Sequence, residues 1–121
     1  MKSILLVEDD PFLIDIYTIK LKDEGYSLIV ATDGEECIKK VEEEKPDLII
    51  LDIVLPKIDG WEILRKIKHN ESSSKSKVII LSNLGQRNEV ERGLKLGADK
   101  YLIKAHYTPS EVVEQIKKML K

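Results

Sequence analysis

The feature that most constrains the fold is the regular alternation of short apolar runs with longer amphipathic segments. The runs are almost uninterrupted in apolar character, which is typical of strands covered on both faces of a parallel sheet. They are Ile4–Val7, Leu28–Ala31, Leu48–Leu51, Val78–Leu81 and Tyr101–Ile103. Strands that alternate with helices favour right-handed crossovers and helices on both faces of the sheet. We therefore expect an α/β fold, a single doubly wound domain of strand–helix units.

The segments between the runs carry helix start signals and apolar residues at helical spacing. The clearest is the last, where Thr108 and Glu111 form a capping box with Pro109 at the first helical position. Its apolar residues are Val112, Val113, Ile116, Met119 and Leu120. The four earlier helices are expected to open at Asp10-Pro11 and at Asp33-Gly34, and to cover Glu62–Lys68 and Glu89–Leu96.

Length and charge narrow the class of protein further. A chain of 121 residues has room for one domain with a real core. It stops directly after the last predicted helix, so we expect residues 1–121 to form this domain, with no output domain present. Charged residues make up 35% of the chain but nearly cancel, to a net charge of -2. This balance leaves no basic excess for phosphates, which argues against direct nucleic acid binding.

The chain also lacks the marks of a membrane or exported protein. No run approaches the roughly 20 apolar residues of a membrane-spanning helix, and the N-terminus has no signal-peptide pattern. We expect no membrane insertion and a cytoplasmic location. The lone Cys37 is expected to be a small buried hydrophobe. The polar stretch NESSSKSK, residues 70–77, is expected to be a solvated loop.

Polar side chains that could form a site follow four of the five predicted strands, because the capping role of Asp33 already explains the polar end of the second. They are Glu8, Asp9 and Asp10 after the first strand, Asp52 after the third, Ser82 and Asn83 after the fourth, and Lys104 after the fifth. A sheet order of 2-1-3-4-5 sets the first strand beside the third, and the carboxyl ends of parallel strands meet at one edge. We therefore expect the carboxylates of strands 1 and 3 to converge there.

These groups together suit phosphoryl transfer. Clustered carboxylates suit a hard divalent cation such as Mg2+. Lys104 adds a second positive charge and Ser82 a hydroxyl donor, so Asp52 could attack a phosphoryl group whose oxygens are neutralised. Taken singly, each residue has a plainer reading. Asp10 could be a helix cap, Glu8, Asp9, Asp52 and Ser82 turn residues, and Lys104 a solvated charge. Their joint placement at one edge favours the site.

Four motifs carry a resemblance over essentially the whole chain. They are ILLVEDD at the first strand, LIILDIVLPKIDG at the third, VIILSN at the fourth and GADKYLIK at the fifth. In this order the chain resembles the receiver domain of two-component response regulators, including the chemotaxis regulators. The resemblance implies a flavodoxin-like fold of five strand–helix units. It also implies a sensor histidine kinase or histidine phosphotransfer protein as donor, and a downstream protein target.

The same resemblance implies a role for each site residue. Asp52 would be the phosphoacceptor, and Ser82 and Lys104 would contact the phosphoryl group. Magnesium, with manganese as an alternative, would be held by Asp9 and Asp52, by Glu8 through water and by the backbone carbonyl of Val54. Tyr101 would be the aromatic switch residue that turns inward when Ser82 moves. The fourth helix, fifth strand and fifth helix would form the face that changes partners.

Some positions depart from the family pattern. Ala105 follows Lys104 where proline is usual, so we expect a trans bond or an altered loop over residues 104–108. Asn83 is bulkier than the usual small residue and is expected to narrow access to Asp52. Val54 and Leu84 are apolar and cannot orient an attacking water. We therefore expect self-phosphorylation on Asp52 with slow self-dephosphorylation, and no turnover of a separate substrate.

Three other functions compete with the phosphoacceptor. A degenerate receiver would act as a non-phosphorylated scaffold, but the acids, Ser82 and Lys104 are all present. A phosphatase of the haloacid dehalogenase type would need a second acid where Val54 stands. A flavin carrier of the same topology would need a phosphate-binding loop after the first strand, where Glu8, Asp9 and Asp10 would repel phosphate.

Overall fold

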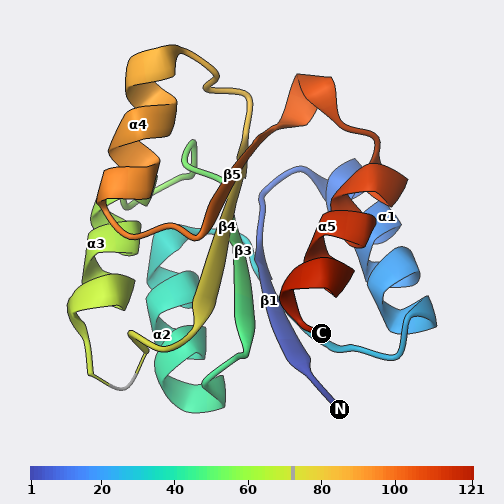
Figure 1. Cartoon of the computed structure of the whole chain (residues 1–121). Coiled ribbons are helices and arrows are strands. Elements are labelled where there is room, and N and C mark those ends of the chain that lie inside the picture. The colour runs from blue at the N-terminus through green and yellow to red at the C-terminus, as the bar shows by residue number, and fades with distance from the viewer. Residues whose placement is uncertain (72) are drawn as a thin grey trace.

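A five-stranded parallel sheet forms the centre of the computed structural model, which describes residues 1–71 and 73–121 (Figure 1). The strands are β1 (Ser3–Val7), β2 (Ser27–Ala31), β3 (Leu48–Leu51), β4 (Lys77–Ser82) and β5 (Lys100–Ile103). Their order across the sheet is β2-β1-β3-β4-β5, and every neighbouring pair is parallel. The predicted fold class and strand order are confirmed.

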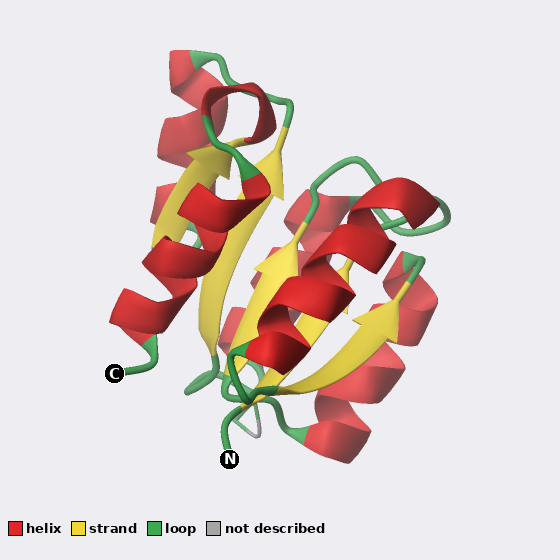
Figure 2. Cartoon of the chain, turned by 90° about the vertical axis from the view of Figure 1, so that its right-hand side faces the viewer, coloured by secondary structure: helices red, strands yellow, loops and turns green. Residues whose placement is uncertain are grey.

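Helices cover both faces of this sheet (Figures 1 and 2). They are α1 (Pro11–Asp23), α2 (Gly34–Glu44), α3 (Gly60–His69), α4 (Arg87–Lys95) and α5 (Pro109–Met119), with a short 3-10 turn over Lys104–His106. Helices α1 and α5 lie on one face, and α2, α3 and α4 on the other. No helix of the described residues is both long and apolar enough to cross a membrane.

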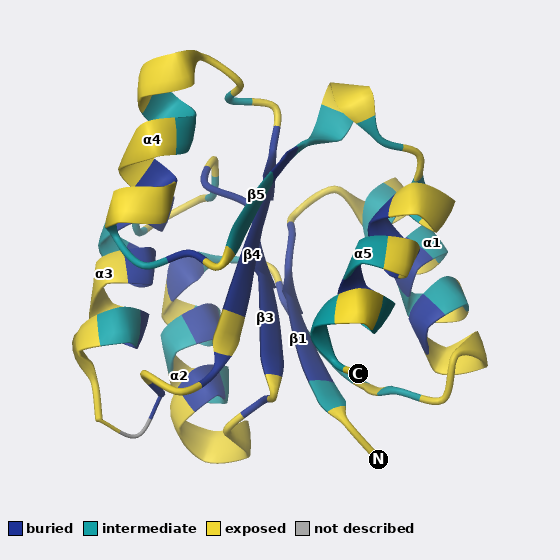
Figure 3. Cartoon of the chain, viewed as in Figure 1, coloured by how far each residue is buried: buried dark blue, intermediate teal, exposed yellow. Residues whose placement is uncertain are grey.

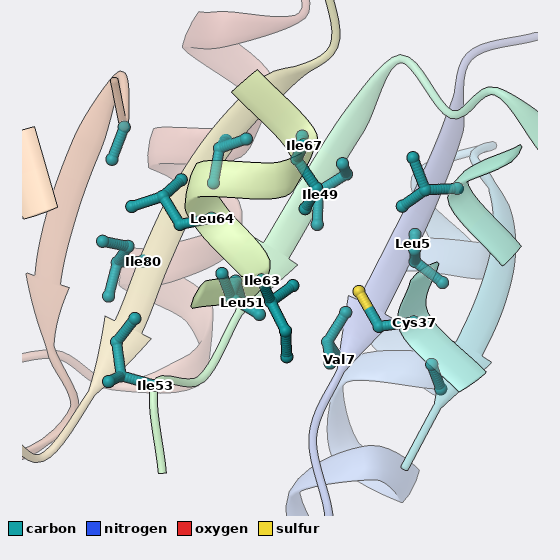
Figure 4. Close-up of a cluster of buried hydrophobic side chains, with 14 of the residues drawn as sticks. Leu5, Val7, Cys37, Ile49, Leu51, Ile53, Ile63, Leu64, Ile67 and Ile80 are labelled. Atoms are coloured by element: carbon teal, nitrogen blue, oxygen red, sulfur yellow. The ribbon is translucent and has the colours of Figure 1, made fainter. Parts of the chain in front are cut away.

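Two apolar cores lie on the two faces of the sheet, because successive strand residues point to opposite sides. On the face of α1 and α5 the buried strand residues include Ile4, Leu6, Leu48 and Ile50. On the other face they include Leu5, Val7, Ile49 and Leu51, packed with Cys37 as predicted (Figure 4). Strands β2 and β5 are only half-buried along most of their length, since they are the edge strands. The expectation of full cover on both faces is wrong for these two strands.

The helix starts follow local capping chemistry. Asp10 and Asp33 accept from the amides of Phe12 and Glu36, both at 2.9 Å, as predicted for N-caps. The Thr108–Glu111 capping box is present. Helix α3 begins two residues earlier than predicted, because Asp59 accepts from the Trp61 amide at 3.1 Å. Helix α4 likewise begins early, because Glu89 accepts from the Gln86 amide at 3.0 Å.

The segment after α3 is less solvated than its composition predicts. Ser73 and Ser76 are buried, and their hydroxyls donate to the carbonyls of Ile67 at 2.8 Å and Pro46 at 2.7 Å. Lys77 already belongs to β4. The expectation of a solvated loop is therefore wrong for these two serines, while Ser72 lies outside the described residues. Short hydroxyl side chains are buried here because backbone carbonyls accept their protons.

The loop after β5 follows the sequence expectation. Among the described residues every peptide bond is trans, so Ala105 follows Lys104 through a trans bond. The chain then turns through Lys104–His106 before Thr108 caps α5. His106 is exposed on this turn, and so is His69 at the end of α3.

Ser76→Ala should lower the free energy of unfolding by about 1–3 kcal/mol, because it leaves the buried Pro46 carbonyl without its donor. The matched control is Ser74→Ala, at an exposed position of the same segment, which should change stability by less than about 0.5 kcal/mol. Urea unfolding of both variants measures the difference. Equal effects would show that the buried hydroxyl contributes nothing specific.

Candidate functional site

The carboxyl edge of the sheet brings the ends of β1 and β3 side by side. Val7 pairs with Leu51 in the last register of these strands, and the Asp52 amide donates to the Val7 carbonyl at 3.1 Å. The Glu8 amide donates to the Ala31 carbonyl of β2 at 3.0 Å. The ladder thus continues one residue past each strand. These two backbone hydrogen bonds fix the main chain at Glu8 and Asp52, so the two residues lie beside each other.

Three carboxylates converge at this edge. One oxygen from each of Glu8, Asp9 and Asp52 lies within 4.8 Å of the others, so the three together could hold a metal ion. Glu8 is 2% exposed and Asp52 6%, whereas Asp9 is exposed. Asp10 does not join them, because its carboxylate caps α1. The plainer reading is thus correct for Asp10, while the prediction of converging carboxylates is confirmed for the other three.

Lys104 offsets part of this negative charge. Its Nζ atom lies 2.7 Å from Glu8 Oε1 and 2.7 Å from Asp52 Oδ2. The lysine side chain is 15% exposed, so the pairs are well shielded from water. Glu8 Oε2 also accepts from the amides of Asp9 and Asp10, each at 3.2 Å. One ammonium therefore bridges the carboxylates contributed by β1 and β3.

The electrostatics follow from burial and from this bridge. Burial raises the pKa of Glu8, an effect that the hydrogen bond and charge of Lys104 oppose and the charge of Asp52 reinforces. Burial acts to lower the pKa of Lys104, but hydrogen bonds and charge from Asp52 and Glu8 outweigh it and raise that pKa. The two neighbouring carboxylates therefore favour the charged form of Lys104.

The loop that follows Asp52 is held by backbone contacts. The Val54 amide donates to Asp52 Oδ1 at 3.1 Å, and the Gly60 amide donates to the Ile53 carbonyl at 3.2 Å. A Cβ atom at Gly60 would lie 2.4 Å from the backbone of Ile53, so only glycine allows this approach. The loop therefore packs tightly against the start of α3. The Val54 carbonyl as a metal ligand stays a prediction.

Ser82 and Tyr101 belong to one hydrogen-bonded unit at the ends of β4 and β5. Ser82 is fully buried, and its Oγ accepts from the Leu84 amide at 3.3 Å. The Tyr101 hydroxyl donates to the Leu84 carbonyl. Burial raises the pKa of Tyr101, and the charges of Glu89 and Asp52 add to this effect. The Tyr101 ring is half-buried and packs against the core of α2, α3 and α4, so it lies inward.

Sequence reasoning missed one part of this unit. Leu84 was considered only for its apolar side chain, which is half-buried, whereas its backbone links Ser82 to Tyr101. The residue type could not have predicted this role, because every residue has a backbone carbonyl that can accept a hydrogen bond. Asn83 is exposed, and its expected narrowing of access to Asp52 stays a prediction.

Asp9→Asn should weaken the affinity for Mg2+ or Mn2+ by about tenfold or more, because it removes one of the three carboxylates that could hold a metal ion. Asp10→Asn is the matched control, since asparagine caps a helix as well as aspartate and Asp10 lies outside the cluster. Isothermal titration calorimetry measures both affinities. An equal loss in the two variants would point to the general charge of this edge and not to a defined site.

Comparison with known proteins was consistent with this geometry. The family model of the response regulator receiver domain matches residues 4–117. The chain is 38% identical over 120 residues to the alkaline phosphatase synthesis transcriptional regulatory protein PhoP of Bacillus subtilis, covering 99% of this chain and 49% of that protein. The chain therefore spans about half the length of this relative.

Solved structures agree with the sequence relatives. The BeF3-activated N-terminal receiver domain of RstA from Klebsiella pneumoniae superposes with a TM-score of 0.89 at 26% identity, covering 99% of both chains. The Mn2+-bound form of the response regulator Rcp1 superposes with a TM-score of 0.81 at 31% identity, covering 91% of this chain and 86% of that one. The chain therefore belongs to the receiver domain family of two-component response regulators.

Proposed function

We propose that Asp52 accepts a phosphoryl group from a sensor histidine kinase or a histidine phosphotransfer protein. The observation that carries the proposal is the setting of its carboxylate. Asp52 is almost buried, one of its oxygens lies 2.7 Å from Lys104 Nζ, and it shares a cluster with Glu8 and Asp9. A buried carboxylate of this kind is a nucleophile held next to the charges that a phosphoryl group requires.

We propose Mg2+ as the resident cation, with Mn2+ as an alternative. The donor set supports it, since hard divalent cations take carboxylate and carbonyl oxygens. Asp9 and Asp52 would bind directly, Glu8 through water, and Val54 through its backbone carbonyl. The Mn2+-bound relative Rcp1 is a receiver with the same fold. When bound, the cation would neutralise charge on the phosphoryl oxygens.

The bonds that form and break in the chemical step belong to this chain and the donor. A carboxylate oxygen of Asp52 attacks the phosphorus atom and forms the new P–O bond. The P–N bond of a phosphohistidine breaks, and its electron pair leaves with the imidazole of the donor. Lys104, which now contacts Asp52 Oδ2, then pairs with a phosphoryl oxygen. The Ser82 hydroxyl donates to another.

In our proposal, phosphorylation of Asp52 switches the protein between two states. Phosphorylation adds close to two negative charges at the carboxyl edge. The Ser82 Oγ that would donate its proton to the phosphoryl group also accepts from the Leu84 amide, and the Leu84 carbonyl in turn accepts from Tyr101. The change therefore reaches the face formed by α4, β5 and α5. With a net charge of -2 the chain has no basic excess, so we propose that this face takes a protein target.

A scaffold role without phosphorylation is not favoured. A receiver that never accepts a phosphoryl group has no need to bury Glu8 and Asp52 against one lysine, because buried charges reduce stability unless they are fully paired. Here the acids, the lysine and the hydroxyl are all in place.

Incubation with Mg2+ and acetyl phosphate should add about 80 Da, one phosphoryl group, to the intact protein. Asp52→Asn should abolish the adduct, because the amide cannot attack phosphorus, while Asp10→Asn should keep it. Intact-mass spectrometry at neutral pH measures all three. Absence of an adduct on the unmodified protein would favour the scaffold role. An adduct on Asp52→Asn would show that another residue accepts the phosphoryl group.

The phosphorylated protein should decay slowly, with a lifetime longer than seconds. Val54 is 59% exposed and Leu84 is half-buried, and neither side chain can orient a water molecule. Polar residues at both positions, as in Val54→Asn/Leu84→Gln, should shorten the lifetime by about tenfold or more. The loss of the mass adduct with time measures this. A lifetime of seconds that both substitutions leave unchanged would contradict the explanation.

A further inference from the structure

Helix α4 is fastened to the sheet through very little buried surface. Gly93 is its only residue in the buried class, whereas α3 buries five of its ten residues, as the described part of the chain shows (Figure 3). A glycine inside a helix is less stable than alanine, because it loses more backbone freedom on folding. Its presence at the one buried position of α4 therefore needs a packing reason.

The packing reason is the ring of Tyr101. A Cβ atom at Gly93 would lie 2.8 Å from Cδ2 and 3.1 Å from Cε2 of that ring, and 2.6 Å from Cδ1 of Ile80. Contacts below 3.0 Å are essentially never made by real Cβ atoms. The ring is therefore packed directly against the α4 backbone at Gly93. Even one methyl group there would displace the ring, Ile80 or the helix.

Both ends of the Tyr101 side chain are thus defined. The hydroxyl donates to the Leu84 carbonyl, and the ring packs against Gly93. On the adjoining position of α4, the Arg92 guanidinium lies 4.6 Å from the ring centre of Trp61 on α3. This cation–π contact opposes an outward movement of α4. We therefore expect extra volume at position 93 to be relieved by turning Tyr101 outward.

We propose that Gly93 is a positioning residue that keeps Tyr101 inward and thereby raises the affinity of Asp52 for a phosphoryl group. The inference rests on the proposed function, because it takes the inward Tyr101 to be the partner of the phosphorylated state. The link is structural. Tyr101 bonds the Leu84 carbonyl, and the Leu84 amide bonds the Ser82 hydroxyl. Two events that share one equilibrium change each other by the same free energy.

The first experiment examines the position of the ring without any phosphoryl group. The four tyrosines are labelled with 3-fluorotyrosine, and Tyr101→Phe assigns the Tyr101 signal in the 19F NMR spectrum. Gly93→Ala should move that signal to the position of a solvent-exposed ring. Leu94→Ala, at the neighbouring exposed position of α4, should leave it in place. A Tyr101 signal unchanged by Gly93→Ala overturns the proposal.

A second variant guards against a folding defect. Ile80→Val removes the Cδ1 atom that an added Cβ would strike, so Ile80→Val/Gly93→Ala leaves the Tyr101 ring as the main obstacle. This double variant should show the same outward Tyr101 signal, with Ile80→Val alone showing the inward one. If the double variant keeps the ring inward, the obstacle is Ile80 and the proposal is wrong.

The second experiment measures binding of beryllofluoride, a phosphoryl mimic, in the presence of Mg2+. Gly93→Ala should weaken this affinity by roughly fivefold or more. It should leave the affinity for Mg2+ alone unchanged, because the three carboxylates follow β1 and β3 and none belongs to α4. A general loss of stability would weaken the binding of beryllofluoride and of Mg2+ together. In a Tyr101→Ala background, Gly93→Ala should have no further effect on beryllofluoride binding.

The outcomes distinguish a failure of the Gly93 proposal from a failure of the phosphoacceptor role of Asp52. If the unmodified protein binds beryllofluoride and Gly93→Ala binds it equally well, Gly93 has no influence on the phosphoryl site and the inference fails alone. If the unmodified protein binds none, the phosphoacceptor role of Asp52 fails and takes the affinity claim with it. The NMR experiment still decides in that case whether Gly93 holds Tyr101 inward.

Discussion

The site depends on one interaction, the bridge that Lys104 makes between Glu8 and Asp52. Two nearly buried carboxylates at the ends of adjacent strands repel each other and lose hydration, so the fold tolerates them only with a cation between them. The lysine directly follows β5, which lies two strands away from β3. Its side chain thus spans the crevice and ties the acidic edge to the element that also carries Tyr101.

The parallel sheet explains why these groups meet at all. Parallel strands end at one edge, and in the order β2-β1-β3-β4-β5 the reversal of strand order falls at β1 and β3. The ladder bond from Asp52 to Val7 places the two acidic strand ends in register. The hydroxyl of Ser82 and the ring of Tyr101 belong to the next two strands, and the Leu84 backbone joins them. Two hydrogen bonds through Leu84 and the packing of the Tyr101 ring on Gly93 therefore connect Ser82 to α4.

The sequence predicted interactions correctly where both partners lie within a few residues of each other. Asp10, Asp33 and Thr108 cap helices because each side chain bonds an amide two or three residues ahead. Burial of the polar segment after α3 was not readable in this way. Ser76 is buried because it meets Pro46, thirty residues earlier in the chain. Its partner is defined only when the strands are assembled.

The sequence by itself determined the strand–helix alternation and the identity of the acidic residues, since periodicity and capping are properties of neighbouring residues. Only the tertiary structure decided which acids share a site. It excluded Asp10, whose carboxylate is used by α1, and it placed one lysine on both Glu8 and Asp52. It alone also brought Gly93 against the Tyr101 ring. Close approach between a helix backbone and a strand side chain depends on packing across elements, which no local pattern encodes.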